Sequence, residues 1–136
     1  MPQIKAKVIK NIVVAPECYK MLLACAPIAK SARPGEFVTI KISAGDQPLL
    51  RRPFGVHRVG ANRFEILYEV VGPGTRILSK KKAGEYIDII GPLGQGFDYH
   101  RPSTIDHRPI LVAGGMGVAP LLFLAEKLVT KSPSHQ

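Results

Sequence analysis

The chain has 136 residues, 46% of them apolar, so it can bury the core of one ordinary domain, and a mainly disordered state is excluded. No stretch reaches the roughly 18 consecutive apolar residues of a membrane span. The alternating start MPQIKAKVIKNIVV is unlike a signal peptide, so we expect a cytoplasmic protein without a membrane partner. The net charge of +9 suits a nucleic acid, an anionic membrane surface, a phosphorylated ligand or merely a solvated basic surface.

Short apolar runs, separated by glycine and proline, fill the first hundred residues. They lie at 4–14, 19–25, 36–42, 53–59, 63–71 and 85–90. The triplet GAN between two of these runs favours a hairpin turn, and GTRILSKKK at 74–82 predicts one short helix that Thr75 caps. The pattern predicts a mainly β domain over residues 1–100, built as an antiparallel barrel or sandwich.

The character of the sequence changes after residue 100. HRPSTIDHRP is polar and flanked by proline, which predicts a linker at 101–109. ILVA at 110–113 is typical of a short buried strand of a parallel sheet, and the glycine turn GGMG follows it. Residues 110–136 are therefore expected to form the first strand–loop–helix unit of an α/β nucleotide-binding domain.

The helix expected from Val118 onwards is apolar around much of its circumference. Its main apolar face comprises positions 118, 121, 122, 125, 128 and 129. Phe123 and Leu124 lie off that face, so the helix requires cover on more than one side. We therefore expect homo-oligomerisation or domain swapping through residues 110–130, or disorder of this segment.

The stretch LLRRPFGVH at 49–57 combines paired positive charge, a stiff backbone and an aromatic ring. Proline holds the chain extended, so Arg51 and Arg52 face opposite ways and only one of them need meet a ligand. An arginine fork suits a pair of phosphate oxygens, and Phe54, on the face of Arg52, can pack on a flat heterocycle. Taken alone, the stretch favours the simpler interpretation, a barrel strand with one exposed arginine and one core phenylalanine.

Three further stretches carry glycine at turns. In YEVVGPGTRILS, Gly72 and Gly74 allow close approach to the backbone at a helix start, where free amides favour an anion, although an ordinary turn has the same composition. Turn chemistry alone explains IGPLGQGF at 90–97. In LVAGGMGVAPL the spacing G-G-x-G falls short of the full dinucleotide fingerprint, and no second strand follows with a ribose-binding acid.

Metal-binding and disulfide patterns are not apparent. Cys18 and Cys25 form no CxxC pair and are interpreted as buried thiols. The four histidines are scattered without the spacing of metal ligands, so no metal site is predicted.

Taken together and in this order, the motifs resemble those of the ferredoxin reductase-like flavoproteins, most closely the electron-transfer subunits of dihydroorotate dehydrogenase. In that family a Greek-key FAD-binding barrel precedes a nicotinamide-binding domain. The matching segments are Arg52-Pro53-Phe54-Gly55, Leu67-Tyr68-Glu69, Gly74-Thr75, the G-P-L-G-x-G-F stretch at 91–97 and the G-G-x-G-x-A-P stretch at 114–120. The resemblance covers residues 4 to about 130.

The resemblance implies a role for each matching segment. Arg52 would hold the FAD pyrophosphate, and residues 53–55 would run along the isoalloxazine. Leu67, Tyr68 and Glu69 would line the flavin or its ribityl chain, Gly74 and Thr75 would donate to the phosphates, and Gly114, Gly115 and Gly117 would approach a nucleotide. No catalytic residue is assigned, because the redox chemistry would be the cofactor's own.

The implied function is an FAD-binding electron-transfer module of an NAD(P)H-linked oxidoreductase, serving a catalytic or electron-accepting subunit. The orotate chemistry of pyrimidine biosynthesis would reside on that separate subunit. Whether the chain is an enzyme by itself is left open, because the expected nicotinamide-binding domain stops after one unit.

Two further departures from the family matter. Gly55 stands where the family usually has serine or threonine, which should alter redox tuning more than cofactor binding. An iron–sulfur cluster needs four thiolates and the chain has two cysteines, so no cluster is expected on it.

The alternative function is a non-catalytic basic barrel that has lost the cofactor. Its charge, with Lys80-Lys81-Lys82 in a row, would then serve RNA, DNA or an acidic protein partner. Aromatic residues are only 7% and do not alternate with the basic ones as stacking platforms do, so nucleic acid is not the expected partner.

Overall fold

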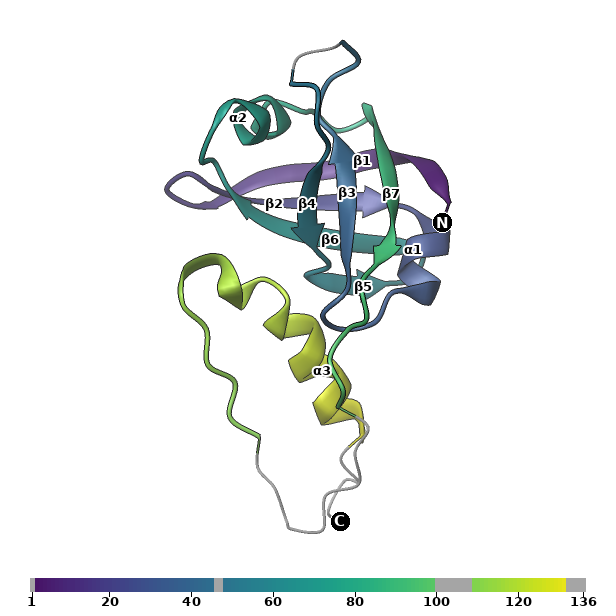
Figure 1. Cartoon of the computed structure of the whole chain (residues 1–136), viewed down its shortest axis with the longest axis vertical. Coiled ribbons are helices and arrows are strands. Elements are labelled where there is room, and N and C mark those ends of the chain that lie inside the picture. The colour runs from purple at the N-terminus through teal and green to yellow at the C-terminus, as the bar shows by residue number, and fades with distance from the viewer. Residues whose placement is uncertain (1, 46–47, 100–108, 132–136) are drawn as a thin grey trace.

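The computed structural model describes residues 2–45, 48–99 and 109–131, and its described part forms a curved β-sheet with short helices at its edges (Figure 1). The strands are β1 (Gln3–Ala15), β2 (Cys18–Ala24), β3 (Phe37–Lys41), β4 (Arg52–Gly55), β5 (Arg58–Gly60), β6 (Arg63–Glu69) and β7 (Tyr86–Leu93). The helices are α1 (Ala26–Ser31), α2 (Pro73–Ser79), the 3₁₀ turn η1 (Gly115–Val118) and α3 (Leu121–Lys131).

All strand pairs are antiparallel, in the order β4-β3-β7-β1-β2-β6-β5. The four strands β7-β1-β2-β6 have the spatial order of a Greek key. β4 and β5 stand at opposite ends of this order, yet only Val56 and His57 separate them along the chain. The sheet therefore has to curl until its ends approach, as the predicted antiparallel barrel requires.

The barrel core follows from two-residue alternation along the strands. In β6 the residues Phe64, Ile66 and Tyr68 point inward and are buried. On the neighbouring strand β2, Leu23 and Met21 stand opposite Phe64 and Ile66 and are fully buried too.

The hairpin and helix predicted in the barrel are confirmed, with two corrections. The run 53–59 is not one strand: β4 pairs with β3 and β5 pairs with β6, because the chain here crosses from one sheet end to the other. Helix α1, which the sequence did not predict, buries Ile28 against the core. A helix of six residues is too short to show a helical period in the sequence.

The segment after residue 109 differs most from expectation. Residues 110–113 form no strand, and Ile110 and Val112 are exposed, because no described segment lies alongside them to pair. The expected helix is present as α3, but its packing face was predicted wrongly: Phe123 and Leu124 are the buried residues, while Val118 and Val129 are exposed. The position of the barrel decides which face of α3 is buried, and the periodicity of apolar residues in the helix carries no information about that position.

The predicted linker at 101–109 lies outside the described residues except for Pro109, and the domain boundaries stay predictions. Across residues 2–45, 48–99 and 109–131, no helix is both long and apolar enough to cross a membrane.

Candidate functional site

A pocket of about 580 Å³ lies between the barrel wall, the start of α2 and the segment before α3. Its lining residues are Arg52, Pro53, Phe54, Gly55, Leu67, Tyr68, Glu69, Val71, Thr75, Met116, Gly117, Ala119 and Pro120. The pocket therefore unites eight of the nine residues proposed from the sequence for the flavin. The ninth, Gly74, lies directly behind Arg52: a Cβ placed on it would be 3.2 Å from Arg52 Nε.

The two adjacent arginines have different partners. Arg51 forms an ion pair with Asp88 on β7 and also donates to the Asp88 carbonyl. Arg52 turns to the pocket and donates to the Leu50 carbonyl at 2.7 Å, and within the described part of the chain no carboxylate lies at ion-pair distance from it. The expectation that only one arginine of the pair faces a ligand site agrees with this arrangement.

The Asp88 carboxylate is held by Arg51 and by Gln3. Burial opposes its ionisation, but hydrogen bonds from Arg51 and Gln3, with the charges of Arg51 and Lys41, outweigh that effect and lower the pKa of Asp88. The Arg51 charge is thus compensated, whereas that of Arg52 is available to an anion in the pocket.

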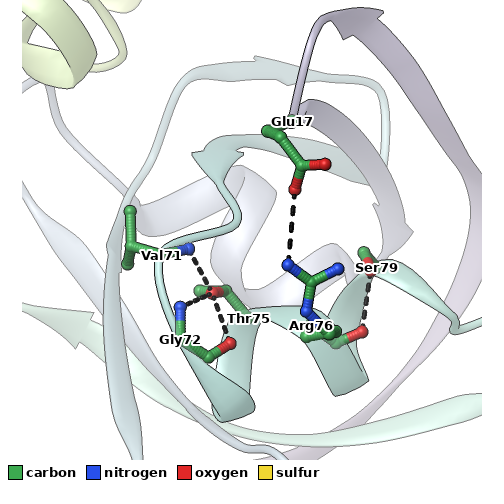
Figure 2. A network of polar contacts seen from close by, with 6 residues as sticks. All are labelled: Glu17, Val71, Gly72, Thr75, Arg76 and Ser79. Atoms are coloured by element: carbon green, nitrogen blue, oxygen red, sulfur yellow. Dashed lines mark hydrogen bonds and ion pairs between the residues drawn. The ribbon is translucent and has the colours of Figure 1, made fainter.

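The start of α2 is held by Thr75, as Figure 2 shows. The Thr75 hydroxyl oxygen accepts from the amides of Val71 at 2.9 Å and Gly72 at 3.3 Å, and the hydroxyl lies 3.3 Å from the Gly72 carbonyl. Arg76 in the same helix points away toward Glu17, with 3.7 Å between Nη2 and Oε2. The N-cap of α2 is Gly72 rather than Thr75 as predicted, because the helix begins at Pro73; Thr75 stands at the third helical position and caps the preceding amides with its hydroxyl oxygen. This hydroxyl, engaged with the backbone, is less available as a ligand donor than the sequence suggested.

The aromatic wall of the pocket consists of rings in mutual contact. Phe54 meets Tyr68 edge to face at 5.8 Å between ring centroids, and Tyr68 stacks on Tyr19 at 5.7 Å. The Tyr68 hydroxyl donates to Asn11 Oδ1 at 2.9 Å. Burial raises the pKa of Tyr68 to about 12, and the hydrogen bond to Asn11 opposes the rise only in part.

Asn11 connects this wall to the far end of α2. Its amide nitrogen donates to the carbonyls of Leu78 and Ser79 at the end of α2 and of Lys81 just after it. Carbonyls at a helix C-terminus lack partners within the helix, so a side-chain donor helps to satisfy them. The sequence did not single out Asn11, because a polar residue within an apolar strand acquires its role only from what the fold places beside it.

The segment before α3 supplies a wall that sequence reasoning largely missed. Of the three glycines proposed for a nucleotide, only Gly117 lines the pocket, whereas Gly114 and Gly115 do not. Met116, Ala119 and Pro120 complete this wall, and a Cβ placed on Gly55 would lie 3.8 Å from Pro120 Cβ.

The G-P-L-G-Q-G-F stretch at 91–97 serves packing. Phe97 N donates to the Pro34 carbonyl at 2.7 Å. Gly96 has a φ of 73°, and a Cβ placed on it would lie only 2.8 Å from the same carbonyl oxygen. None of these residues lines the pocket, in agreement with the turn interpretation. Among the described residues no group of three histidine, cysteine, aspartate or glutamate side chains could hold a metal ion.

No protein-family model matches the chain. The electron transfer subunit of dihydroorotate dehydrogenase B (NAD(+)) from Desulforamulus reducens is 41% identical over 125 residues, covering 90% of this chain and 47% of that protein. The subunit of the same name from a Geobacillus species is 39% identical over 133 residues, covering 96% and 51%. The chain thus spans about half the length of the curated relatives it matches.

Solved structures share the fold. The structure of NADH-dependent reduced ferredoxin-NADP oxidoreductase, described in connection with flavin-based electron bifurcation, is 30% identical with a TM-score of 0.63 and covers 68% of this chain and 34% of its own. The flavohemoglobin of Malassezia yamatoensis, with bound FAD and heme, is 22% identical with a TM-score of 0.75 and covers 96% and 35%.

The barrel and its pocket thus define a protein with the ferredoxin reductase-like fold. In sequence the chain is a homologue of the electron transfer subunits of dihydroorotate dehydrogenase B, which confirms the resemblance predicted from its motifs.

Proposed function

We propose that this chain is an FAD-binding electron-transfer module of an NAD(P)H-linked oxidoreductase. One observation carries the proposal. The Arg52 guanidinium, which has no carboxylate partner among the described residues, and the first turn of α2 converge on one pocket, and Phe54 and Tyr68 form the aromatic wall of the same pocket.

The residues present fit the two chemically different parts of FAD. Arg52 would pair with the diphosphate, and the backbone at Gly74 and Thr75 would add amide donors, since the first amides of a helix lack intrahelical acceptors. Residues 53–55 would lie along the isoalloxazine, and Leu67, Tyr68 and Glu69 would face the ring or the ribityl chain. The flavin supplies the electron chemistry when bound, and the protein contributes position and electrostatics.

The proposed partner is a catalytic or electron-accepting subunit, as the name of the curated relatives implies for those proteins. NAD(P)H as electron donor, a cytoplasmic location and oligomerisation through residues 110–130 are further proposals.

The decisive experiment is titration of flavin-free protein with FAD, followed by absorbance between the near-ultraviolet and the blue and by calorimetry. We expect saturable binding of one FAD, with perturbed flavin bands. ADP should compete, because it shares the diphosphate, and riboflavin should bind more weakly than FAD. Absence of flavin uptake by folded protein would refute the proposal, and a mobility shift of RNA or DNA at moderate salt would then favour the basic binding module.

A further inference from the structure

His57 is a buried titratable residue that the proposed function does not use. It lies between β4 and β5, retains 8% of its surface exposed, and its backbone amide donates to the Glu65 carbonyl at 2.8 Å. Its ring Nδ1 lies 2.5 Å from the carbonyl oxygen of Ala119. A carbonyl only accepts, so Nδ1 carries the proton and donates it to Ala119.

This hydrogen bond joins the barrel to the segment before α3, and two neighbouring contacts act at the same interface. Phe123 is fully buried within the barrel's core cluster. Arg58, next to His57, pairs through Nε with Glu126 Oε1 at 2.8 Å. Figure 1 shows α3 lying beneath the barrel beside β5, with the chain from residue 109 running up to η1 before it turns into the helix.

The position of Ala119 determines what this contact can do. Ala119 belongs to the pocket wall formed by Met116, Gly117, Ala119 and Pro120, and Pro120 lies against Gly55. Phe123 packs the helix that follows against the barrel, but the hydrogen bond from His57 is made to a residue of the wall itself. His57 lies in the two-residue connection between β4 and β5, so its ring links the barrel directly to the facing wall of the pocket.

We propose that His57 is a positioning residue that, through its hydrogen bond to Ala119, seats residues 116–120 as one wall of the cofactor pocket. The inference rests on the proposed function for the identity of the ligand, whereas the seating of the wall is a property of the protein alone. A seated wall covers the pocket beside Gly55, and a released wall exposes this part of the bound flavin to solvent.

The test compares His57→Leu with His57→Asn. Leucine fills part of the ring volume without a donor, whereas the asparagine amide nitrogen is as many bonds from the backbone as Nδ1 and can donate to Ala119. Glu126→Gln is the control, because it changes a half-exposed ion pair on the same helix, keeps a side chain of the same length, and surface pairs of this kind contribute little. Should His57→Leu fail to fold, His57→Gln replaces it, since the longer side chain carries its amide beyond the Nδ1 position.

Hydrogen–deuterium exchange of peptides spanning 115–131, without flavin, reports the seating. We expect exchange roughly tenfold faster in His57→Leu than in wild type. In His57→Asn and in the Glu126→Gln control, exchange should stay within about twofold of the wild-type rate. With FAD present, iodide should quench flavin fluorescence more strongly in His57→Leu, and FAD affinity should fall roughly tenfold, again with recovery in His57→Asn.

Unchanged exchange in His57→Leu would overturn the proposal, as would equal behaviour of the leucine and asparagine variants, which would mean that the ring only fills space. Faster exchange with unchanged iodide access and FAD affinity would show that the segment is not a wall of the cofactor site. If wild type takes up no FAD, the proposed function fails, and the exchange measurement still decides whether His57 seats the segment.

Discussion

Arg52 on β4 lies against Gly74 in the first turn of α2, so close that a Cβ on Gly74 would be 3.2 Å from Arg52 Nε and 3.5 Å from Arg52 Cγ. The Gly74 backbone is not in the left-handed region, so what the glycine provides here is space: a side chain would push the Arg52 stem aside by a few tenths of an ångström. The glycine lets the arginine stem lie on the helix, so that the guanidinium and the helix start face the same pocket.

The adjacent arginines provide a matched pair of variants. Arg52→Ala should weaken FAD binding by about 1.5–3 kcal/mol, which is roughly 10- to 150-fold, because one charge-assisted contact is lost. Arg51→Ala should leave FAD affinity nearly unchanged and lower stability instead, because Arg51 is bound to Asp88 on β7. Calorimetric titration of both variants measures this, and equal losses of affinity would mean that the assignment of Arg52 is wrong.

Tyr68→Phe should lower the free energy of unfolding by about 1–3 kcal/mol, because Asn11 Oδ1 loses its donor in a partly buried position. Tyr19→Phe keeps the stacked ring and is the control, with an expected change within about 0.5 kcal/mol. Urea denaturation provides the comparison. Ultraviolet titration of folded wild type should show Tyr68 ionising only near its raised pKa of about 12.

Acid stability should depend on Asp88. The pKa of its carboxyl is lowered in the folded state, so its contribution to stability is present above the unfolded pKa and is lost as the pH falls through the folded value. Wild type should therefore lose stability as the pH drops below about 4, the ordinary range of a carboxyl group. In Asp88→Asn this part of the pH dependence should disappear, whereas replacement of the exposed Glu17 by glutamine should preserve it.

Gly55→Ser should be accommodated, because a Cβ at position 55 would be in ordinary van der Waals contact, 3.8 Å from Pro120 Cβ. If residue 55 faces the flavin edge as proposed, a new hydroxyl should move the midpoint potential of bound FAD by about 10–30 mV, the equivalent of one hydrogen bond. FAD affinity should change by less than roughly threefold. Spectroelectrochemistry measures the potential, and an unchanged value would place residue 55 away from the ring.

Exposed apolar side chains of the C-terminal segment should promote self-association. Ile110, Val112 and Val129 are 87%, 85% and 73% exposed, while Phe123 on the other side of α3 is buried in the barrel. We expect concentration-dependent dimers in sedimentation velocity, reduced in a Val112→Ser/Val129→Lys double variant that leaves Phe123 in place. A clean monomer at all concentrations would contradict this.

The barrel was predictable from sequence because its strands alternate, and a period of two marks the buried face wherever one side of a strand meets the core. Arg52, Phe54 and Tyr68 were assigned to a common site because their residue types suit phosphate and ring binding and because the motifs resemble a known family. The resemblance also led to Gly74 and Thr75, whose local turn chemistry alone was ambiguous.

Only the tertiary structure shows which arginine of the pair has a carboxylate partner, since Arg51 forms its ion pair with Asp88 on β7, far along the chain. It likewise decided that Asn11 supports the aromatic wall and α2, and that Phe123 rather than the main apolar stripe of α3 is buried. The contact of His57 with Ala119 has no local signal either. The periodicity of apolar residues predicts which side of a segment is buried on average. These individual contacts depend instead on which distant segment of the chain the fold places beside each residue.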